Sequence, residues 1–218
     1  MENGVHLSLN WFLYNASTMR VIAGLAKRRG LKSVSKSHGV RPILARIKKS
    51  LFDILQPRLP GAAFLDLFAG SGAVGIEALS RGAESVTFVD KNPVCLSVIR
   101  QNLSRLGLSG KARVIKGDAA GNLHSLGGTY DIIFMGPPYH DQNWNALHLT
   151  APALRAIAEA RVLRPGGIVV GQHHSKELPV DDPAWELYRQ EKYGDTRLSF
   201  FRPCSVVNAE PSTAGDPL

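Results

Sequence analysis

Two short segments carry the residue types from which the chemistry of this chain can be inferred. The first, Leu65 to Gly72, reads LDLFAGSG and places glycines after an apolar run, where a strand would turn sharply into a helix. Glycine at such a turn lets a nucleotide-like ligand approach bare backbone. The second, Gly136 to Tyr139, puts two prolines and an aromatic ring after another apolar run, which makes a rigid ledge for a stacked base. Together they predict a methyl-donor site that faces a planar amine.

The residues around the first segment fit two nucleotide cofactors to different degrees. Residues 70–75 match the dinucleotide fingerprint, and Asp90 ends the next apolar run at a distance suited to a carboxylate that binds ribose hydroxyls. These features serve NAD and S-adenosylmethionine equally. Asp66 lies inside the first predicted strand, where an acid suits a methionine ammonium better than a pyrophosphate. S-adenosylmethionine is therefore the predicted cofactor, and an NAD-dependent dehydrogenase is the alternative.

Residues at the ends of the following strands complete the predicted donor site. Lys91 and Asn92 would line the adenine, and Asp118 would face its amino group, although an ordinary turn acid fits that position equally well. For Asp90 the plain alternative is a strand-end acid that caps the next helix. The predicted donor-binding residues are Asp66, Phe68, Gly70, Gly72, Asp90, Lys91, Asn92, Asp118 and Ala119.

The proline ledge is the most diagnostic segment. A proline pair can be a mere loop signal, but stacking a flipped base on an adjoining aromatic ring is worth roughly 1–3 kcal/mol and favours a role in base modification. His140 after the ledge, and His173 and His174 at the end of the fifth predicted strand, are not needed as bases, because the amine loses its proton after attack. No spacing of Cys, His or carboxylates indicates a metal site. The predicted catalytic residues are Gly136, Pro137, Pro138 and Tyr139.

Basic residues are concentrated near the N-terminus. The formal net charge is +8, and residues 3–52 carry ten Lys and Arg and no Asp or Glu, whereas the rest carries 16 basic and 18 acidic residues. An isolated charge run is usually a solvated face, but beside a base-modifying site it favours binding to phosphates. The predicted RNA-binding residues are Arg20, Lys27, Arg28, Arg29, Lys32 and Arg41.

From residue 62 onward, short apolar runs alternate with helical stretches, which predicts an α/β fold with a mostly parallel sheet and helices on both faces. The expected strands cover 63–67, 85–89, 112–115, 130–135 and 168–171, with two edge strands at 185–193 and 196–201. The expected helices cover 73–81, 93–106 and 144–163, after an amphipathic helix that ends before Pro57. Residues 164–167 are expected to turn into the fifth strand.

Length and composition predict one sizeable core with an appendage. We divide the chain into a tail (1–18), a basic hairpin and helix (19–57), a catalytic domain (58–204) and a disordered tail (205–218). No run approaches the roughly 18 apolar residues of a membrane span, and a secretory signal is absent. The two cysteines, Cys95 and Cys204, are too few for a disulfide framework. We expect a soluble, cytosolic monomer with free thiols.

Longer stretches around these segments are similar to a known family. They comprise Leu65 to Gly75 with the following Ile76 to Ala83, Arg41-Pro42, Leu51-Phe52, and Tyr193 to Thr196. Over about 20–202 the chain resembles the bacterial 16S ribosomal RNA guanine-N2 methyltransferases. The resemblance implies a Rossmann-like seven-stranded sheet and S-adenosylmethionine as donor. It also implies, as substrate, one guanine of 16S rRNA in a 30S subunit or assembly intermediate.

The chain departs from that family at two places. Gly136 precedes the ledge where the family usually has Asp, or Asn in related amino-methyltransferases, and Ile43 and Lys49 stand where the family usually has Thr and Glu. Glycine cannot supply a side-chain acceptor that orients the amine, so we expect a slowed enzyme. The alternatives are an RNA-binding or ribosome-assembly factor that has lost activity, and a DNA adenine-N6 methyltransferase, which would share the ledge.

Overall fold

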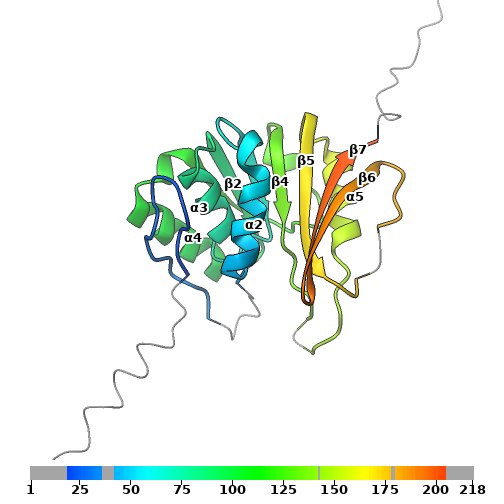
Figure 1. Ribbon diagram of the computed structural model, residues 1–218, viewed down its shortest axis with the longest axis horizontal. Helices are drawn as coiled ribbons and strands as arrows, with labels where there is room; N and C mark the ends of the chain where they lie inside the picture. The colour runs from blue at the N-terminus through cyan, green and yellow to red at the C-terminus, as the bar shows by residue number, and fades with distance from the viewer. Residues whose placement is uncertain (1–18, 36–41, 142, 178–179, 205–218) are drawn as a thin grey trace, which may run out of the picture.

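Seven strands form one sheet in the computed structural model, which describes residues 19–35, 42–141, 143–177 and 180–204 (Figure 1). The sheet order is β3-β2-β1-β4-β5-β7-β6; β1 to β5 pair in parallel, and β7 pairs antiparallel with β5 and β6. The strands are β1 (Ala63–Leu67), β2 (Ser85–Asp90), β3 (Ala112–Lys116), β4 (Tyr130–Met135), β5 (Leu163–His174), β6 (Trp185–Tyr193) and β7 (Thr196–Pro203). The predicted Rossmann-like, mostly parallel seven-stranded sheet is confirmed.

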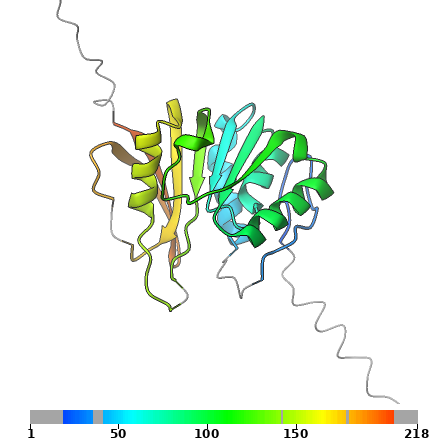
Figure 2. The same ribbon diagram turned by 180° about the vertical axis from the view of Figure 1, so that it is seen from behind.

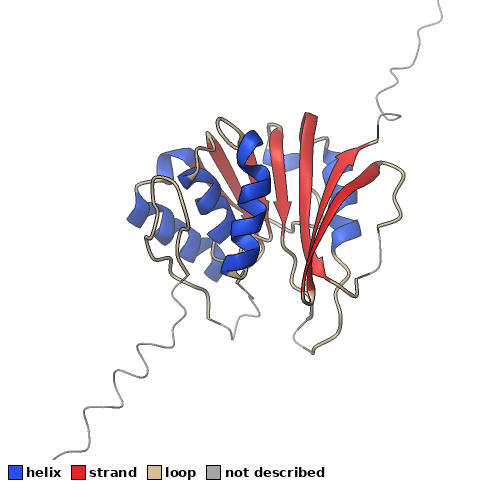
Figure 3. Cartoon of the chain, viewed as in Figure 1, coloured by secondary structure: helices blue, strands red, loops and turns tan. Residues whose placement is uncertain are grey.

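Helices lie on both faces of this sheet (Figure 3). They are α2 (Ala45–Leu55), α3 (Ala73–Ser80), α4 (Pro93–Leu106) and α5 (Thr150–Ala160), with short 3₁₀ turns η2 (Gln56–Arg58), η3 (Ser109–Lys111) and η4 (His124–Leu126). Figures 1 and 2 show α2, α3 and α4 on one face and α5 on the other. Within the described ranges, no helix is long and apolar enough to cross a membrane.

Strand periodicity divides the core between the two faces. Phe64 of β1 packs in the apolar cluster shared with α2, α3 and α4, whereas Leu65 and Leu67 pack in the cluster shared with α5. Alternate residues of a strand point to opposite faces, so a strand covered on both sides is apolar throughout. Asp66 interrupts that run of apolar residues and therefore places an acid on the face covered by α3.

The helix before β5 is shorter than the sequence predicted. The prediction was 144–163, but α5 spans Thr150–Ala160. The Oδ1 atom of Asp141 accepts the N–H groups of Asn143 and Asn145, each at 2.8 Å, and Trp144 between them has a φ of 63°. A carboxylate that binds backbone two residues on stabilises a turn in place of a helix. The predicted helical start was therefore wrong.

Strand β5 begins earlier than predicted. Tyr130 pairs with Leu163, and Ile132 pairs with Ile168, so the predicted turn at 164–167 is an irregularity inside the strand pair. Gly166 has a φ of 75°, which suits a residue without Cβ. The predicted tight turn was therefore wrong, because β5 runs through these residues and pairs with β4 on both sides of the irregularity.

The basic segment at 19–35 is bound to α3 through Glu77. This fully buried carboxylate accepts the N–H groups of Ile22 and Ala23 at 2.8 and 2.9 Å and forms ion pairs with Lys48 at 3.0 Å and Arg81 at 2.8 Å. Burial alone would raise the pKa of Glu77, but Lys48, the Ile22 N–H and Arg81 together hold it below its usual value. Arg20 and Gly30 form an antiparallel bridge within the segment. The predicted tails lie outside the described residues.

Candidate active site

The first predicted segment forms a strained turn between β1 and α3. Phe68, Gly70 and Gly72 have φ angles of 58°, 56° and 77°, and Gly72 is the N-cap of α3. The left-handed region is favourable for glycine and costly for a bulky residue such as phenylalanine. Strain of this kind is found where the surrounding structure fixes a ligand-binding conformation. The turn presents backbone at the carboxyl end of β1, where open α/β sheets bind ligands.

Two glycines allow α3 to pack closely, Gly75 against β2 and Gly72 against α4. A Cβ atom added at Gly75 would lie 2.3 Å from Cε1 of Phe88, and one added at Gly72 would lie 3.1 Å from Cγ1 of Ile99. Protein interiors are close-packed, so neither contact could be accommodated without movement.

Two acids hold the turn by hydrogen bonds. Asp66, only 1% exposed, accepts the N–H of Gly75 at 2.8 Å through Oδ2. Asp90 accepts the N–H of Gly70 at 2.8 Å through Oδ2 and that of Asn92 at 2.8 Å through Oδ1. Burial raises the pKa of Asp66 to about 8; the Gly75 N–H opposes this change and the nearby Asp90 charge adds to it. A cation bound beside Asp66 would lower this pKa and favour the charged carboxylate.

The remaining predicted donor-binding residues lie at the same edge, and two of them also have local structural roles. The Oδ1 atom of Asn92 caps α4 by accepting the N–H of Val94 at 2.9 Å. Asp118 is exposed, and its Oδ1 atom accepts the N–H of Ala120 at 3.0 Å. Lys91 is exposed and Ala119 is buried. The sequence offered two roles for Asp118, in the adenine site or in a turn, and the structure shows the turn. The cap at Asn92 was not predicted from the sequence.

The second predicted segment begins beside the first. The N–H of Gly136 donates to the carbonyl oxygen of Leu67 at 3.3 Å, which joins the ends of the adjacent strands β4 and β1. Pro137 is buried, and Pro138 is partly exposed. A Cβ atom added at Gly136 would lie 3.1 Å from Cε1 of Phe134. The glycine-rich turn and the proline ledge therefore lie side by side at the carboxyl ends of β1 and β4.

Tyr139 is fixed by residues far away in sequence. Its hydroxyl donates to Oγ1 of Thr196 and accepts from Nε2 of Gln172, both at 3.2 Å. The ring of His174 meets the Tyr139 ring edge-on, with centroids 5.6 Å apart and an interplanar angle of 82°. Gln172 and His174 belong to β5 and Thr196 to β7, so the sheet edge positions the phenol. No local pattern around Tyr139 identifies these partners; Thr196 appears only within a segment of the family resemblance.

His173 and Cys95 are not candidate catalytic groups of this site. His173 is buried, with Nε2 2.8 Å from Oγ of Ser199, and burial lowers its pKa. Burial, followed by the charge of Asp90 and a hydrogen bond to it, raises the pKa of Cys95 to about 12, so Cys95 is a thiol rather than a nucleophilic thiolate. Both cysteines are free. Among the described residues, no three His, Cys, Asp or Glu side chains gather in a way that could hold a metal ion.

The predicted RNA-binding residues within the described segment are exposed: Arg20, Lys27, Arg28, Arg29 and Lys32. Arg29 donates to the carbonyl of Arg105 at 3.0 Å, and Nζ of Lys32 donates to Gln101 at 2.7 Å. Asn102 of α4 binds both the backbone of Lys32 and the carbonyl of Ser71 in the glycine-rich turn. The basic segment is thus held next to that turn. Arg41 lies outside the described residues.

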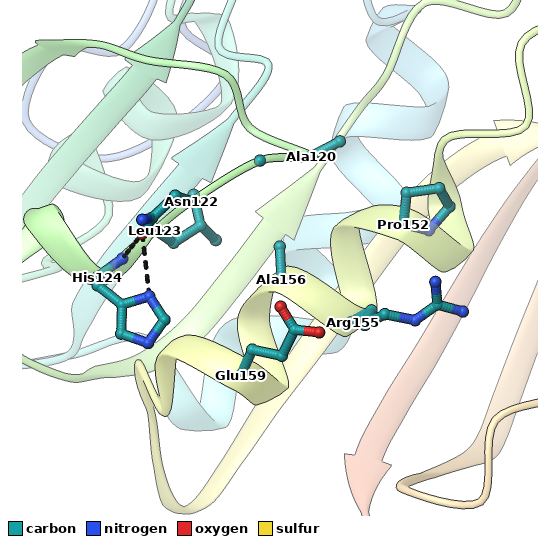
Figure 4. Close-up of a pocket in the computed structure, with 9 residues that line it drawn as sticks. Ala120, Asn122, Leu123, His124, Pro152, Arg155, Ala156 and Glu159 are labelled. Atoms are coloured by element: carbon teal, nitrogen blue, oxygen red, sulfur yellow. Dashed lines mark hydrogen bonds between the residues drawn. The ribbon is translucent and has the colours of Figure 1, made fainter.

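A separate cavity of about 280 Å³ lies between α5 and the loop that follows β3 (Figure 4). It is lined by Ala120, Gly121, Asn122, Leu123, His124, Pro152, Arg155, Ala156 and Glu159. Asn122 accepts the backbone N–H of His124 at 2.9 Å and lies 2.9 Å from its Nδ1 atom, which orders the rim. None of these residues belongs to the glycine-rich turn or the ledge, so the cavity does not define the predicted reaction site.

A family model described as Conserved hypothetical protein 95 matches residues 19–202. The chain belongs to this family. The protein named "Ribosomal RNA small subunit methyltransferase D" of Escherichia coli (strain K12) is 38% identical over 185 residues, which are 84% of this chain and 89% of that protein. Its namesake from Haemophilus influenzae is 31% identical over 179 residues, covering 81% of this chain and 89% of that protein.

Solved structures agree with the sequence comparison. The Escherichia coli protein yhhF is 27% identical, with a TM-score of 0.71, and covers 85% of this chain and 98% of its own. The resemblance predicted from sequence is confirmed for the family. The two relatives above and the Escherichia coli structure carry methyltransferase names, and the chain is a methyltransferase by family and fold.

Proposed function

We propose that this protein is an S-adenosylmethionine-dependent methyltransferase that modifies the N2 amine of a specific guanine in 16S rRNA. It acts in the cytoplasm, as a monomer, on a 30S subunit or assembly intermediate. The observation that carries the proposal is the hydrogen bond between Gly136 and Leu67, which sets the glycine-rich turn beside the proline ledge. A donor and a planar acceptor can meet only where their binding segments share an edge. The names of the relatives support the ribosomal substrate.

The residues of the glycine-rich turn fit the proposed donor. Its bare backbone at Gly70 and Gly72 leaves room for a nucleoside, and Asp66 offers a buried carboxylate that a bound ammonium would ionise. Asp90 would bind ribose hydroxyls, and Asp118 would face the adenine. When bound, S-adenosylmethionine supplies an electrophilic methyl group on a sulfonium. The protein's task is to hold that donor and the acceptor amine in line.

The acceptor side relies on rigidity. Pro137 and Pro138 restrict the backbone, and Tyr139 is fixed by hydrogen bonds from two strands, so a flipped guanine can stack without ordering these groups first. Gly136 offers no side-chain acceptor to the amine. The carbonyl oxygens of Gly136 and Pro137 are the acceptors that we assign to orient it. This arrangement predicts slow but measurable turnover.

Transfer of a radiolabelled methyl group tests the proposal. Small ribosomal subunits that lack the modification, naked 16S rRNA and double-stranded DNA are incubated with enzyme and labelled donor, and the modified base is identified after digestion. Label in the N2 amine of guanine from ribosomal substrate is the expected result. Label in DNA adenine would instead identify a DNA methyltransferase. RNA binding without label in any substrate would identify an assembly factor.

Gly136→Asp tests the acceptor side of the site. The added carboxylate should orient the amine and raise kcat by roughly 10- to 150-fold, the equivalent of one hydrogen bond to a charged group. The new Cβ would lie close to Phe134, so Gly136→Ala is the matched control for crowding alone. Gly136→Ala should equal or fall below the wild-type rate. If Gly136→Asp is no faster than Gly136→Ala, that position does not orient the amine.

The basic segment is tested by replacing Lys27, Arg28 and Arg29 with alanine. If these side chains neutralise phosphates, RNA affinity should fall and the slope of log K against log salt should become shallower by about 0.7 to 0.9 for each phosphate that is no longer neutralised. Lys111 lies in η3, outside the segment, and Lys111→Ala serves as the control for removal of a positive charge elsewhere. An unchanged salt slope in the triple variant would mean that the segment only promotes solubility.

A further inference from the structure

The loop between β4 and α5 presents a large exposed aromatic ring beside the proline ledge. Trp144 is 82% exposed and has a φ of 63°, a conformation that is costly for a residue with a bulky side chain. Figures 1 and 2 both show this loop extending past the strand ends, at the end of the molecule where α2 begins. Backbone strain persists only where surrounding contacts impose it.

Those contacts are present on both sides of Trp144. Asp141 accepts the N–H groups of Asn143 and Asn145 and the side-chain amide of Asn145, each at 2.8 Å. These bonds, with the amide of Asn145 first, hold the pKa of Asp141 below its usual value, so the carboxylate stays charged and tied within the loop. His140 and Ala146 also form an antiparallel bridge. These contacts within the loop therefore fix its backbone and hold Trp144 exposed to solvent.

The aromatic rings continue from the ledge to the loop tip. The ring centroids of Tyr139 and His174 are 5.6 Å apart, those of His174 and His140 are 6.2 Å apart, and those of His140 and Trp144 are 5.6 Å apart. Adjacent planar rings at a strand end provide successive surfaces on which unpaired bases can stack. The series starts at Tyr139, which we assign to the target base, and ends at the exposed Trp144.

We propose that Trp144, supported by His140, is a stacking platform for the unpaired nucleotide next to the target guanine. This proposal rests on the proposed function, because the ledge defines where the target lies. A flipped base leaves its neighbours without one stacking partner, and an indole is a suitable replacement. RNA is favoured over a protein partner because the exposed basic segment, which fits phosphates, belongs to the same molecule. Trp144 would thus position RNA without reading its sequence.

A double-mutant cycle with modified RNA tests the platform directly. Binding is measured for an RNA hairpin that carries the target guanine in its loop, and for the same hairpin with abasic sugars at the flanking positions. Wild-type protein should lose roughly 5- to 150-fold in affinity on the abasic hairpin, the range expected for one base–aromatic stack. Trp144→Ala should bind both hairpins equally weakly, and Trp144→Phe should retain most of the discrimination. The salt slope should not change, because no charge is removed.

Controls separate this idea from its alternatives. Leu187 on β6 is another exposed apolar residue, at 47% exposure, and Leu187→Ala should behave like wild type. Equal losses by wild type and Trp144→Ala on the abasic hairpin would overturn the platform. An effect of Trp144→Ala confined to assembled subunits would also overturn it and indicate a protein contact. Binding is read without turnover, so a wild-type protein that transfers no methyl group refutes the proposed function while the cycle still decides the role of Trp144.

Discussion

The two halves of the proposed site are built in different ways. The glycine-rich turn is held by two acids of the parallel sheet: the buried Asp66 binds Gly75, and the half-buried Asp90 binds Gly70. The loop after the ledge is held mainly by itself, through Asp141, and ends in the exposed ring of Trp144. Buried, cooperative contacts resist substitution, whereas local surface contacts allow a loop to vary. The donor half is thus held rigidly by the sheet, and substrate specificity can change in the loop beyond the ledge rather than at Tyr139, which β5 and β7 fix.

Crowding the donor half should have the largest effect. Gly75→Ala would place a Cβ atom 2.3 Å from Cε1 of Phe88, and overpacking of a tight core typically costs about 1–3 kcal/mol. The variant should lose donor binding in calorimetry and show a lower urea midpoint. Gly110 has no atom within 4 Å of an added Cβ, so Gly110→Ala should change neither quantity.

A second variant keeps this prediction testable if Gly75→Ala fails to fold. Phe88→Leu removes the ring that the new methyl would meet and leaves Cγ1 of Val86 at 2.8 Å, so Gly75→Ala combined with Phe88→Leu should recover part of the stability and part of the donor affinity. Recovery would show that Gly75 is needed for the approach of α3 to the sheet. A Gly75→Ala variant with normal donor binding would contradict the rigidity assigned to this half.

The charge in the donor half has the next largest effect. Asp66→Asn keeps the acceptor for the Gly75 N–H and removes the negative charge, so donor affinity should fall roughly 10- to 150-fold if a charged hydrogen bond is removed. Asp131→Asn is the matched control, because Asp131 also accepts a backbone N–H, that of Ala63, at the other end of β1. Calorimetry should detect a loss only for Asp66→Asn.

Asp66→Asn should weaken donor binding, but it should raise the stability of the protein without donor. Because the folded-state pKa of Asp66 is raised to about 8 from a usual value of 3.8, the native state holds a proton that the unfolded chain has released between these values. Wild-type stability should therefore fall as pH rises through this window. Asp66→Asn removes that decline. In urea unfolding without donor, the free energy of unfolding of the variant relative to wild type should therefore be higher at pH 8.5 than at pH 5. An advantage that does not grow with pH would contradict the raised pKa.

The same contrast explains what could be read from the sequence. The strands of the parallel sheet and the turn at Gly70 and Gly72 were predictable, because apolar runs and glycine spacing are local signals. The start of α5 was not, because the side chain of Asp141 decides it. The partners of Tyr139 come from β5 and β7, and only tertiary structure joins them. Sequence periodicity identifies elements, whereas the position of the Tyr139 ring depends on contacts between distant segments.

The smallest predicted effect concerns Asn92, which caps α4 and was also predicted to line the adenine. Its side chain caps α4, so Asn92→Ala should lower the free energy of unfolding by about 1 kcal/mol, whereas Asn92→Ser should retain most of the cap. If the side chain also touches the adenine, both variants should bind the donor more weakly, because serine restores the cap but not the amide. If it serves only the helix, donor affinity should remain at the wild-type value in Asn92→Ser. Calorimetry of the serine variant therefore decides whether the donor half uses Asn92 for binding or only for support.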